Sequence, residues 1–281
     1  MDTNTLDYTD NRLTADVATQ CVLHVVLGAD SISLLSADSS GAILALQSWA
    51  FSAEGQVFDQ TEWSLRSVLR QPVFGLPFGH THCGLFHRNA TLVPRRLFQH
   101  GNLAAYFKLL LNPAEYIYAY DELPEFDAYL VYATEQGLAK LCTDFFPRAR
   151  IRHLAVPLLR QARDVNASEE HRIFVNIRNQ VAQIAVFERQ NLLFYNSFAF
   201  SASSDLLYYI LMVYDQFRLD PRDIPLTVAG NLLEDSELYR LLYRFIRDIR
   251  FTALPGYYKM PTEAELLPGH CYFDLFCLKN L

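Results

Sequence analysis

The order of strand and helix signals in the second half of the chain is the feature that most constrains its fold. A run of paired strands is expected at residues 172–178, 181–188 and 191–200, where apolar residues recur between short polar turns. A helix, a strand and another helix are expected next, at residues 204–218, 224–229 and 232–249. Strands that are followed by alternating helices and strands indicate an α/β protein.

The first half follows a similar order. Three strands are expected at residues 21–28, 31–37 and 42–51, a helix at 56–70, a hairpin at 81–94 around Arg88-Asn89 and a helix at 97–111. Further strands and helices are expected at 115–120, 128–134, 135–146, 150–155 and 157–163, before a polar linker at 164–170. Two halves with one shared order suggest an internal duplication. We therefore expect a flexible N-terminal tail (1–18), a first domain (19–165) and a second domain (166–281).

Composition excludes several classes of protein. The 281 residues suffice for two domains with cores of their own. A net charge of −7 without a basic cluster disfavours nucleic acid as a partner. The five cysteines form no CxxC motif, so we expect free thiols in a reducing cytoplasm. The polar start, MDTNTLDYTD, does not resemble a signal peptide, and the apolar run at 206–214 is too short for a membrane span.

The twofold order resembles the actin, sugar-kinase and chaperone ATPase superfamily. More closely, the chain resembles an uncharacterised bacterial family of that superfamily (domain of unknown function 3822), related in general shape to actin-like proteins of pilus assembly and cell division. The similar segments lie at residues 91–98, 128–153, 173–198, 235–242 and 270–276. The resemblance implies a duplicated actin-like, ribonuclease-H-like architecture, with two domains that each contain a mixed five-stranded sheet flanked by helices.

The same resemblance implies a nucleotide site whose motifs are degenerate here. The first phosphate turn of the superfamily has the form Asp-x-Gly-Thr, but Val26 stands at the Asp position, while Gly28 remains. The second has the form Asp-x-Gly-Gly, and here Asn176 and Arg178 replace the Asp and the first Gly. Asparagine has no charge to offer a divalent cation, and arginine fills space that glycine leaves open.

The adenosine turn expects two glycines, and Gly230-Asn231 retains one of them. Because metal and positioned phosphate contacts supply most of phosphoryl-transfer catalysis, three altered turns argue against ATP hydrolysis. We therefore expect no cofactor and lean toward a protein that is not an enzyme. An alternative stays open, in which the altered turns bind a nucleotide or small anion without metal through the positions Gly28, Asn176, Arg178, Gly230 and Asn231.

Three other groups of side chains could support chemistry. His80, His82, Cys83 and His87 could ligate a metal, but on a strand Cys83 points away from the two histidines before it. Cys271 beside His270 could be a nucleophile, although neighbours on an extended chain face opposite sides. The third group is an acidic loop of Asp121, Glu122, Glu125 and Asp127. Paired carboxylates could act in acid–base catalysis, but a solvated loop is the simpler interpretation.

The sequence therefore favours a non-catalytic actin-like protein that acts through protein–protein contacts. Aromatic residues make up 14% of the chain, and eight of them lie between Tyr106 and Tyr132, where some could form a partner surface. The partner could be another protein or a second copy of the chain.

Overall fold

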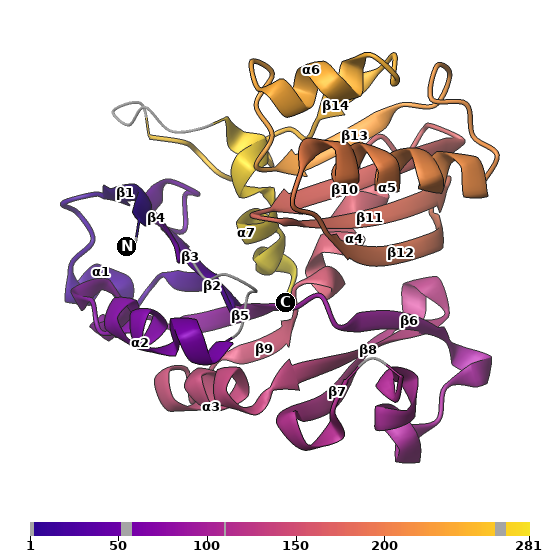
Figure 1. Cartoon of the computed structure of the whole chain (residues 1–281). Helices are drawn as coiled ribbons and strands as arrows, with labels where there is room; N and C mark the ends of the chain where they lie inside the picture. Colours follow the sequence, from indigo (N-terminus) through magenta and orange to yellow (C-terminus); the bar gives the residue numbers. More distant parts are fainter. Residues whose placement is uncertain (1–2, 52–57, 110, 262–267) are drawn as a thin grey trace.

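Two mixed sheets and a smaller antiparallel sheet form the framework of the chain in this computed structural model, which describes residues 3–51, 58–109, 111–261 and 268–281 (Figure 1). The first sheet has the order β1-β4-β3-β2-β5-β9, with β1 Thr3–Thr9, β2 Val22–Gly28, β3 Ser31–Ala37, β4 Ile43–Ala50, β5 His80–Phe86 and β9 Arg150–His153. The second has the order β12-β11-β10-β13-β14, with β10 His171–Arg178, β11 Val181–Glu188, β12 Asn191–Ala199, β13 Leu226–Gly230 and β14 Ile249–Phe251.

One topology is used twice. In each large sheet three antiparallel strands (β4-β3-β2 and β12-β11-β10) are followed by two parallel strands (β5-β9 and β13-β14). This confirms the predicted α/β architecture with an internal duplication. The first sheet has a sixth strand because β1 pairs with β4 at its edge.

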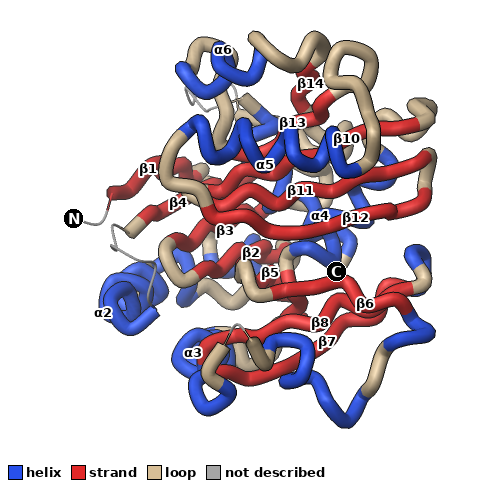
Figure 2. The backbone as a smooth tube through the Cα atoms, turned by 45° about the vertical axis from the view of Figure 1, so that its right-hand side comes forward, coloured by secondary structure: helices blue, strands red, loops and turns tan. Residues whose placement is uncertain are grey.

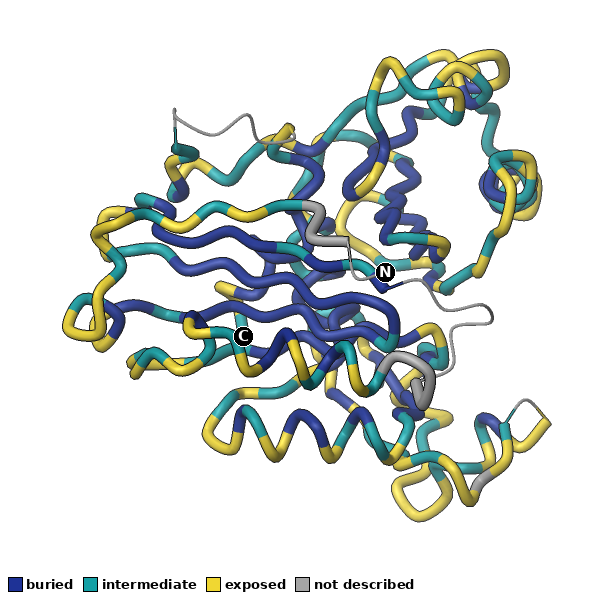
Figure 3. Tube along the Cα trace, turned by 60° about the vertical axis from the view of Figure 1, so that its left-hand side comes forward, coloured by how far each residue is buried: buried dark blue, intermediate teal, exposed yellow. Residues whose placement is uncertain are grey.

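Helices cover both faces of the large sheets, which explains why their central strands are apolar at nearly every position. The outer face of the first sheet packs on α2 (Phe58–Leu69) and α3 (Gln136–Phe145), and that of the second on α5 (Ser203–Gln216) and α6 (Glu237–Tyr243). The inner faces pack on α4 (Ala155–Asp164) and α7 (Phe273–Cys277). Figure 3 shows the resulting burial along the strands.

The short helix α7 lies between the two large sheets (Figure 1). It contacts β2 and β3 of the first sheet, β13 of the second, and α4. The helical turn before it, η6 (Gly269–Tyr272), is buried from His270 on, and the turn after it, η7 (Leu278–Asn280), buries Leu278. The last segment of the chain therefore joins the cores of both halves.

The small sheet has the order β6-β8-β7, with β6 Ala90–Pro94, β7 Tyr116–Leu123 and β8 Ala128–Glu135. Its strand β6 contacts β12, the edge strand of the second large sheet (Figure 2). The predicted hairpin over residues 81–94 is wrong: β5 and β6 follow one another in the chain but belong to different sheets, because β5 pairs in parallel with β2 and β6 pairs with β8.

Other expected elements also differ. Residues 3–9, expected within a flexible tail, form β1, because Leu6 and Tyr8 pack against the core and Gln47 Nε2 donates to Asp7 Oδ1 at 2.6 Å. The helix α1 (Ala15–Ala18) follows. The helix expected over residues 97–111 is a series of 3₁₀ turns, interrupted by the non-helical backbone of Asn102. The helix expected over 232–249 is only α6, which Ser236 caps by accepting from the Tyr239 N–H at 3.1 Å.

Among the described residues, no helix combines the length and apolarity needed to cross a bilayer.

Candidate functional site

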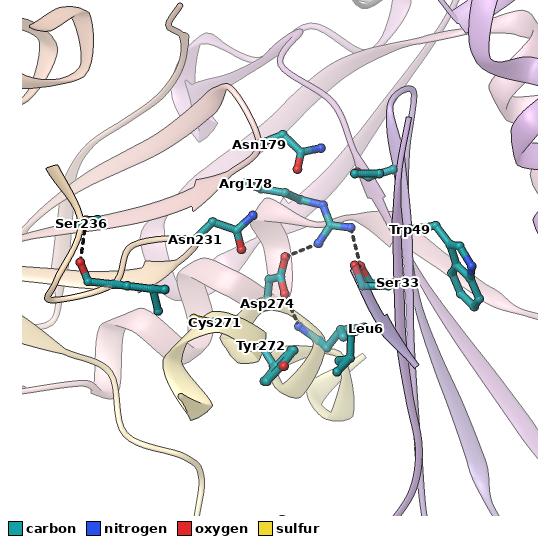
Figure 4. Close-up of a pocket in the computed structure, with 15 residues that line it drawn as sticks. Leu6, Ser33, Trp49, Arg178, Asn179, Asn231, Ser236, Cys271, Tyr272 and Asp274 are labelled. Atoms are coloured by element: carbon teal, nitrogen blue, oxygen red, sulfur yellow. Dashed lines mark hydrogen bonds and ion pairs between the residues drawn. The ribbon is translucent and has the colours of Figure 1, made fainter. Parts of the chain in front are cut away.

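The two turns that correspond to the phosphate turns of the superfamily lie against each other and are joined by their own side chains. Arg178, the last residue of β10, extends its guanidinium toward the first sheet and α7 (Figure 4). Its Nη1 donates to Asp274 Oδ2 of α7 at 2.8 Å, and its Nη2 donates to Ser33 Oγ of β3 at 2.9 Å. One side chain therefore connects the second sheet, the first sheet and the helix between them.

A second contact joins the tips of the same two turns. Asn179 Nδ2 donates to Asp30 Oδ2 at 2.9 Å, and Asp30 Oδ1 accepts from Ser31 Oγ at 3.0 Å. Asn179 has a φ of 50°, a left-handed conformation that asparagine adopts more readily than most residues. The tight turn of β10–β11 thus presents its amide directly to the turn of β2–β3.

The Arg178–Asp274 ion pair is buried, with side-chain exposures of 10% and 5%. Leu275 N–H also donates to Asp274 Oδ1 at 2.7 Å, so both oxygens of the carboxylate have partners. The guanidinium lies 5.7 Å from the centre of the Phe86 ring. A buried pair of this kind is strongly sensitive to the loss of either partner, because the remaining charge is then left uncompensated away from water.

The residues at the expected magnesium positions do not fit a divalent cation. Val26 has no exposed surface and belongs to the apolar cluster that faces α7. Asn176 is also fully buried, and its Nδ2 donates to Gln183 Oε1 at 3.0 Å. Gln183 in turn donates to Tyr195 Oη at 2.8 Å. The Asn176 amide is therefore part of a buried polar chain within the second sheet, and Mg²⁺ prefers carboxylate and phosphate oxygens that these positions lack.

Gly230, the last residue of β13 and part of the turn that corresponds to the adenosine turn, is required by the backbone geometry. Gly230 has a φ of 83°, and a Cβ at this position would lie 2.0 Å from the Ile177 carbonyl oxygen of the adjacent strand. Asn231 N–H donates to that same oxygen at 2.7 Å. Close approach of the β13 and β10 backbones therefore requires glycine there. Gly28, at the end of β2, would place a Cβ 3.3 Å from Phe86, a tight contact without backbone strain.

A pocket of about 380 Å³ opens beside the ion pair (Figure 4). Arg178, Asn179, Asn231 and Asp274 contribute its polar wall, and Trp49, Leu6 and Tyr272 contribute apolar surface. Of the five candidate residues, the structure therefore brings Arg178 and Asn231 to this pocket. Gly28, Asn176 and Gly230 are not among the residues that line it.

The other constellations do not assemble a site. His82 Nδ1 lies 2.9 Å from the Leu278 carbonyl oxygen, and His87 Nε2 lies 2.5 Å from Glu135 Oε2. Cys83 faces the opposite, outer core. Within the described part of the chain, no three His, Cys, Asp or Glu side chains converge as metal ligands.

The candidate nucleophile, Cys271, is a buried free thiol. Burial raises the pKa of Cys271 to about 11, so its thiol stays protonated near neutral pH. His270 Nε2 lies 2.7 Å from the Leu232 carbonyl oxygen.

The acidic loop is held by arginines. Asp121 pairs with Arg152 at 3.1 Å, Glu122 with Arg95 at 2.6 Å and Glu125 with Arg160 at 2.5 Å. Burial raises the pKa of Asp121. These carboxylates therefore form ion pairs that hold the loop in place.

The sequence model of a family described as "Protein of unknown function (DUF3822)" matches residues 10–249. The chain belongs to this family. The match extends from just after β1 to the first residue of β14, so it includes β2 to β13 and leaves out β1 and α7. It confirms the resemblance drawn from the sequence. No curated protein matches the chain.

Solved structures show the fold. A crystal structure from Bacteroides thetaiotaomicron VPI-5482, described as a protein with actin-like ATPase fold and unknown function, has a TM-score of 0.72 at 17% identity, over 86% of this chain and 94% of that chain. A chain of a PilM–PilN type IV pilus biogenesis complex has a TM-score of 0.62 at 13% identity, over 92% of this chain and 97% of that chain. The duplicated architecture is therefore the actin-like ATPase fold, as predicted.

Sequence reasoning missed the partners of Arg178. Asp274 stands in the otherwise apolar run CYFDLFC, and an acidic residue inside such a run is a signal of a buried, paired charge. Ser33 and Asp30 carried no comparable signal, because serine and aspartate are ordinary residues at a strand and its turn.

Proposed function

We propose that this protein is a non-catalytic actin-like protein that acts through contacts with other proteins. The observation that carries the proposal is the direct connection of the two phosphate turns by Arg178, Asp274 and Ser33. A guanidinium stands where the superfamily leaves space for phosphate, and its charge is compensated by the chain's own carboxylate.

The chemistry of the altered turns supports the same conclusion. Phosphoryl transfer depends on a metal and on donors aimed at the transferred group. The expected metal positions hold Val26 and an asparagine that donates to Gln183, and Arg178 already has a partner. A protein without this machinery can still use the fold as a scaffold for binding. The PilM–PilN complex is an example of a protein of this fold in a complex with another protein.

Calorimetric titration of ATP and ADP, with and without Mg²⁺, tests the proposal. We expect no heat of binding and no thermal stabilisation at nucleotide concentrations up to the millimolar range. Magnesium-dependent ATP turnover by the purified protein, abolished by Asn176→Ala, would contradict it.

Binding of a small anion without metal is the second candidate. It is favoured by the pocket, whose wall includes the donors of Arg178, Asn179 and Asn231. Against it, Asp274 competes for the guanidinium that would hold the anion. Titration with inorganic phosphate separates the two candidates, because saturable binding that is lost in Arg178→Met supports the second. The buried free cysteines agree with a cytoplasmic site of action, which is part of the proposal.

A further inference from the structure

Four arginines and two exposed aromatic rings gather on the second half of the chain, at a surface that shares no lining residue with the pocket beside Arg178. Two adjoining, shallow and largely open hollows of about 600 and 280 Å³ share the residues Arg222, Arg244 and Phe245. Arg218 lines the larger hollow, and Arg247 and Tyr243 line the smaller one. We name these six residues the arginine–aromatic patch. It lies where the loop after α5 meets the loop after α6, on the outer side of the second sheet (Figure 1).

The patch is positively charged although the chain as a whole carries −7. Among the described residues, Arg218, Arg244 and Arg247 have no carboxylate within ion-pair distance. Arg222 forms an ion pair with Asp220 at 2.7 Å. Asp248, the residue after Arg247, forms its ion pair with Arg250 at 2.5 Å. Three uncompensated guanidinium groups therefore face solvent around two hollows.

Local structure explains only part of this arrangement. Arg218 follows α5 and Arg244 is the C-cap of α6, and a cation at a helix C-terminus gains about 0.3–1 kcal/mol from the helix dipole. Arg222 is held locally by its ion pair with Asp220. Neither effect accounts for Arg247, which lies in a loop. Nor do they account for the exposure of Tyr243 at 60% and Phe245 at 48%.

A backbone hydrogen bond joins the two loops, because Arg247 N–H donates to the Pro221 carbonyl at 3.1 Å. The loop after α5 is also held to its own helix, since Tyr214 Oη donates to the Ile224 carbonyl at 3.0 Å. Arginine and aromatic side chains are among the residues that most often dominate binding energy at protein interfaces.

We propose that the arginine–aromatic patch binds an acidic peptide segment of a partner protein, with carboxylates on the guanidinium groups and an aromatic or apolar side chain against Tyr243 and Phe245. This deepens the proposed function, on which it rests, by naming the surface and the chemistry of the partner. Arginine pairs with carboxylate through two parallel hydrogen bonds, which sets the geometry as well as the charge. Nucleic acid is disfavoured because four arginines on a strongly acidic molecule offer few phosphate contacts.

Selection from a random dodecapeptide display library on the purified, full-length protein tests the proposal without assuming a sequence. We expect enriched peptides with several Asp or Glu residues and an aromatic residue. Fluorescence anisotropy of the consensus peptide should show binding that weakens several-fold between about 50 and 200 mM salt. Arg244→Ala/Arg247→Ala and, separately, Phe245→Ser should each weaken it at least tenfold.

The matched control is Arg96→Ala/Arg148→Ala, which removes two exposed arginines of the first domain and should leave peptide affinity unchanged. Thermal unfolding of each variant excludes misfolding as the cause of lost binding. Enrichment without an acidic bias, or equal enrichment on the Arg244→Ala/Arg247→Ala variant, overturns the proposal. So does tighter binding of a twenty-residue oligothymidylate or of vesicles with anionic lipid through the same arginines.

Failure here and failure of the proposed function have different signatures. ATP turnover is measured on the wild type and on Asn176→Ala, while peptide binding is measured on variants of the patch. A protein that turns over ATP with Mg²⁺ and also binds the peptide contradicts the proposed function but not the patch. A protein that has no ATP turnover and does not bind the peptide contradicts only the proposed surface.

Discussion

Replacing Arg178 by methionine removes the charge that joins the two halves and leaves Asp274 buried without a cation. Both side chains are at most 10% exposed, so the pair belongs to the buried class. Breaking such a pair costs about 3–5 kcal/mol, compared with about 0–1 kcal/mol for an exposed pair. At roughly 2 °C per kcal/mol for a chain of this size, Arg178→Met should lower the Tm by roughly 6–10 °C.

A double-mutant cycle separates the buried charge from lost packing. Asp274→Leu alone should cost about as much as Arg178→Met, whereas the double variant should cost about 1 kcal/mol or less, because no unpaired charge remains. Urea unfolding can be followed by the fluorescence of the two tryptophans, of which Trp49 lines the pocket beside the pair. Single variants that each cost less than about 1 kcal/mol, or a double variant no better than the worse single, would refute the reasoning.

Three further predictions follow from the same structure. Asp274→Asn frees the Arg178 guanidinium, so calorimetry should show inorganic phosphate binding at least about tenfold tighter than in the wild type, and Arg178→Met/Asp274→Asn should show no gain. Gly230→Ala should cost more than about 2 kcal/mol in urea unfolding, because the added Cβ meets the Ile177 carbonyl at a positive φ, whereas Gly256→Ala, with open space around it, should be nearly neutral. Burial lowers the pKa of His24 and of His153 to about 3. As the pH falls below 6.5, these histidines become protonated in the unfolded state but stay neutral in the folded state. The free energy of unfolding should therefore fall by about 1.4 kcal/mol per pH unit for each histidine. Unfolding midpoints at pH 7 and 5.5 measure this slope, and an unchanged slope in His153→Gln would contradict the assignment.

The repeated part of the fold could be predicted from the sequence because its signals are local. The apolar runs at 172–178 and 181–188 and the helical spacing at 204–218 correspond closely to β10, β11 and α5. Pairing between strands that are distant in the chain depends on how the sheets pack in the folded protein, and a short stretch of sequence does not contain that information. The hairpin predicted at 81–94 failed for this reason, since β5 is drawn to β2 and β6 to β8.

The sequence indicated which turns to examine, but not the side-chain contacts that these turns make. The matching turns identified Arg178 and Asn231, which do reach the pocket, and Asn176, which instead bonds to Gln183. The partner of Arg178 lies 96 residues further along the chain, and only the fold brings it near. The division into domains at residue 165 stays a prediction.

The position of α7 also has a consequence for the order in which the protein can form. Both large sheets precede α7 in the chain, yet each needs it to cover part of its inner face, and Asp274 on α7 neutralises Arg178. During synthesis, apolar strands of both halves therefore emerge from the ribosome before their shared cover is made. A nascent chain that stops before residue 273 would carry an exposed seam and an unpaired arginine, a state that chaperones bind and that a finished chain hides.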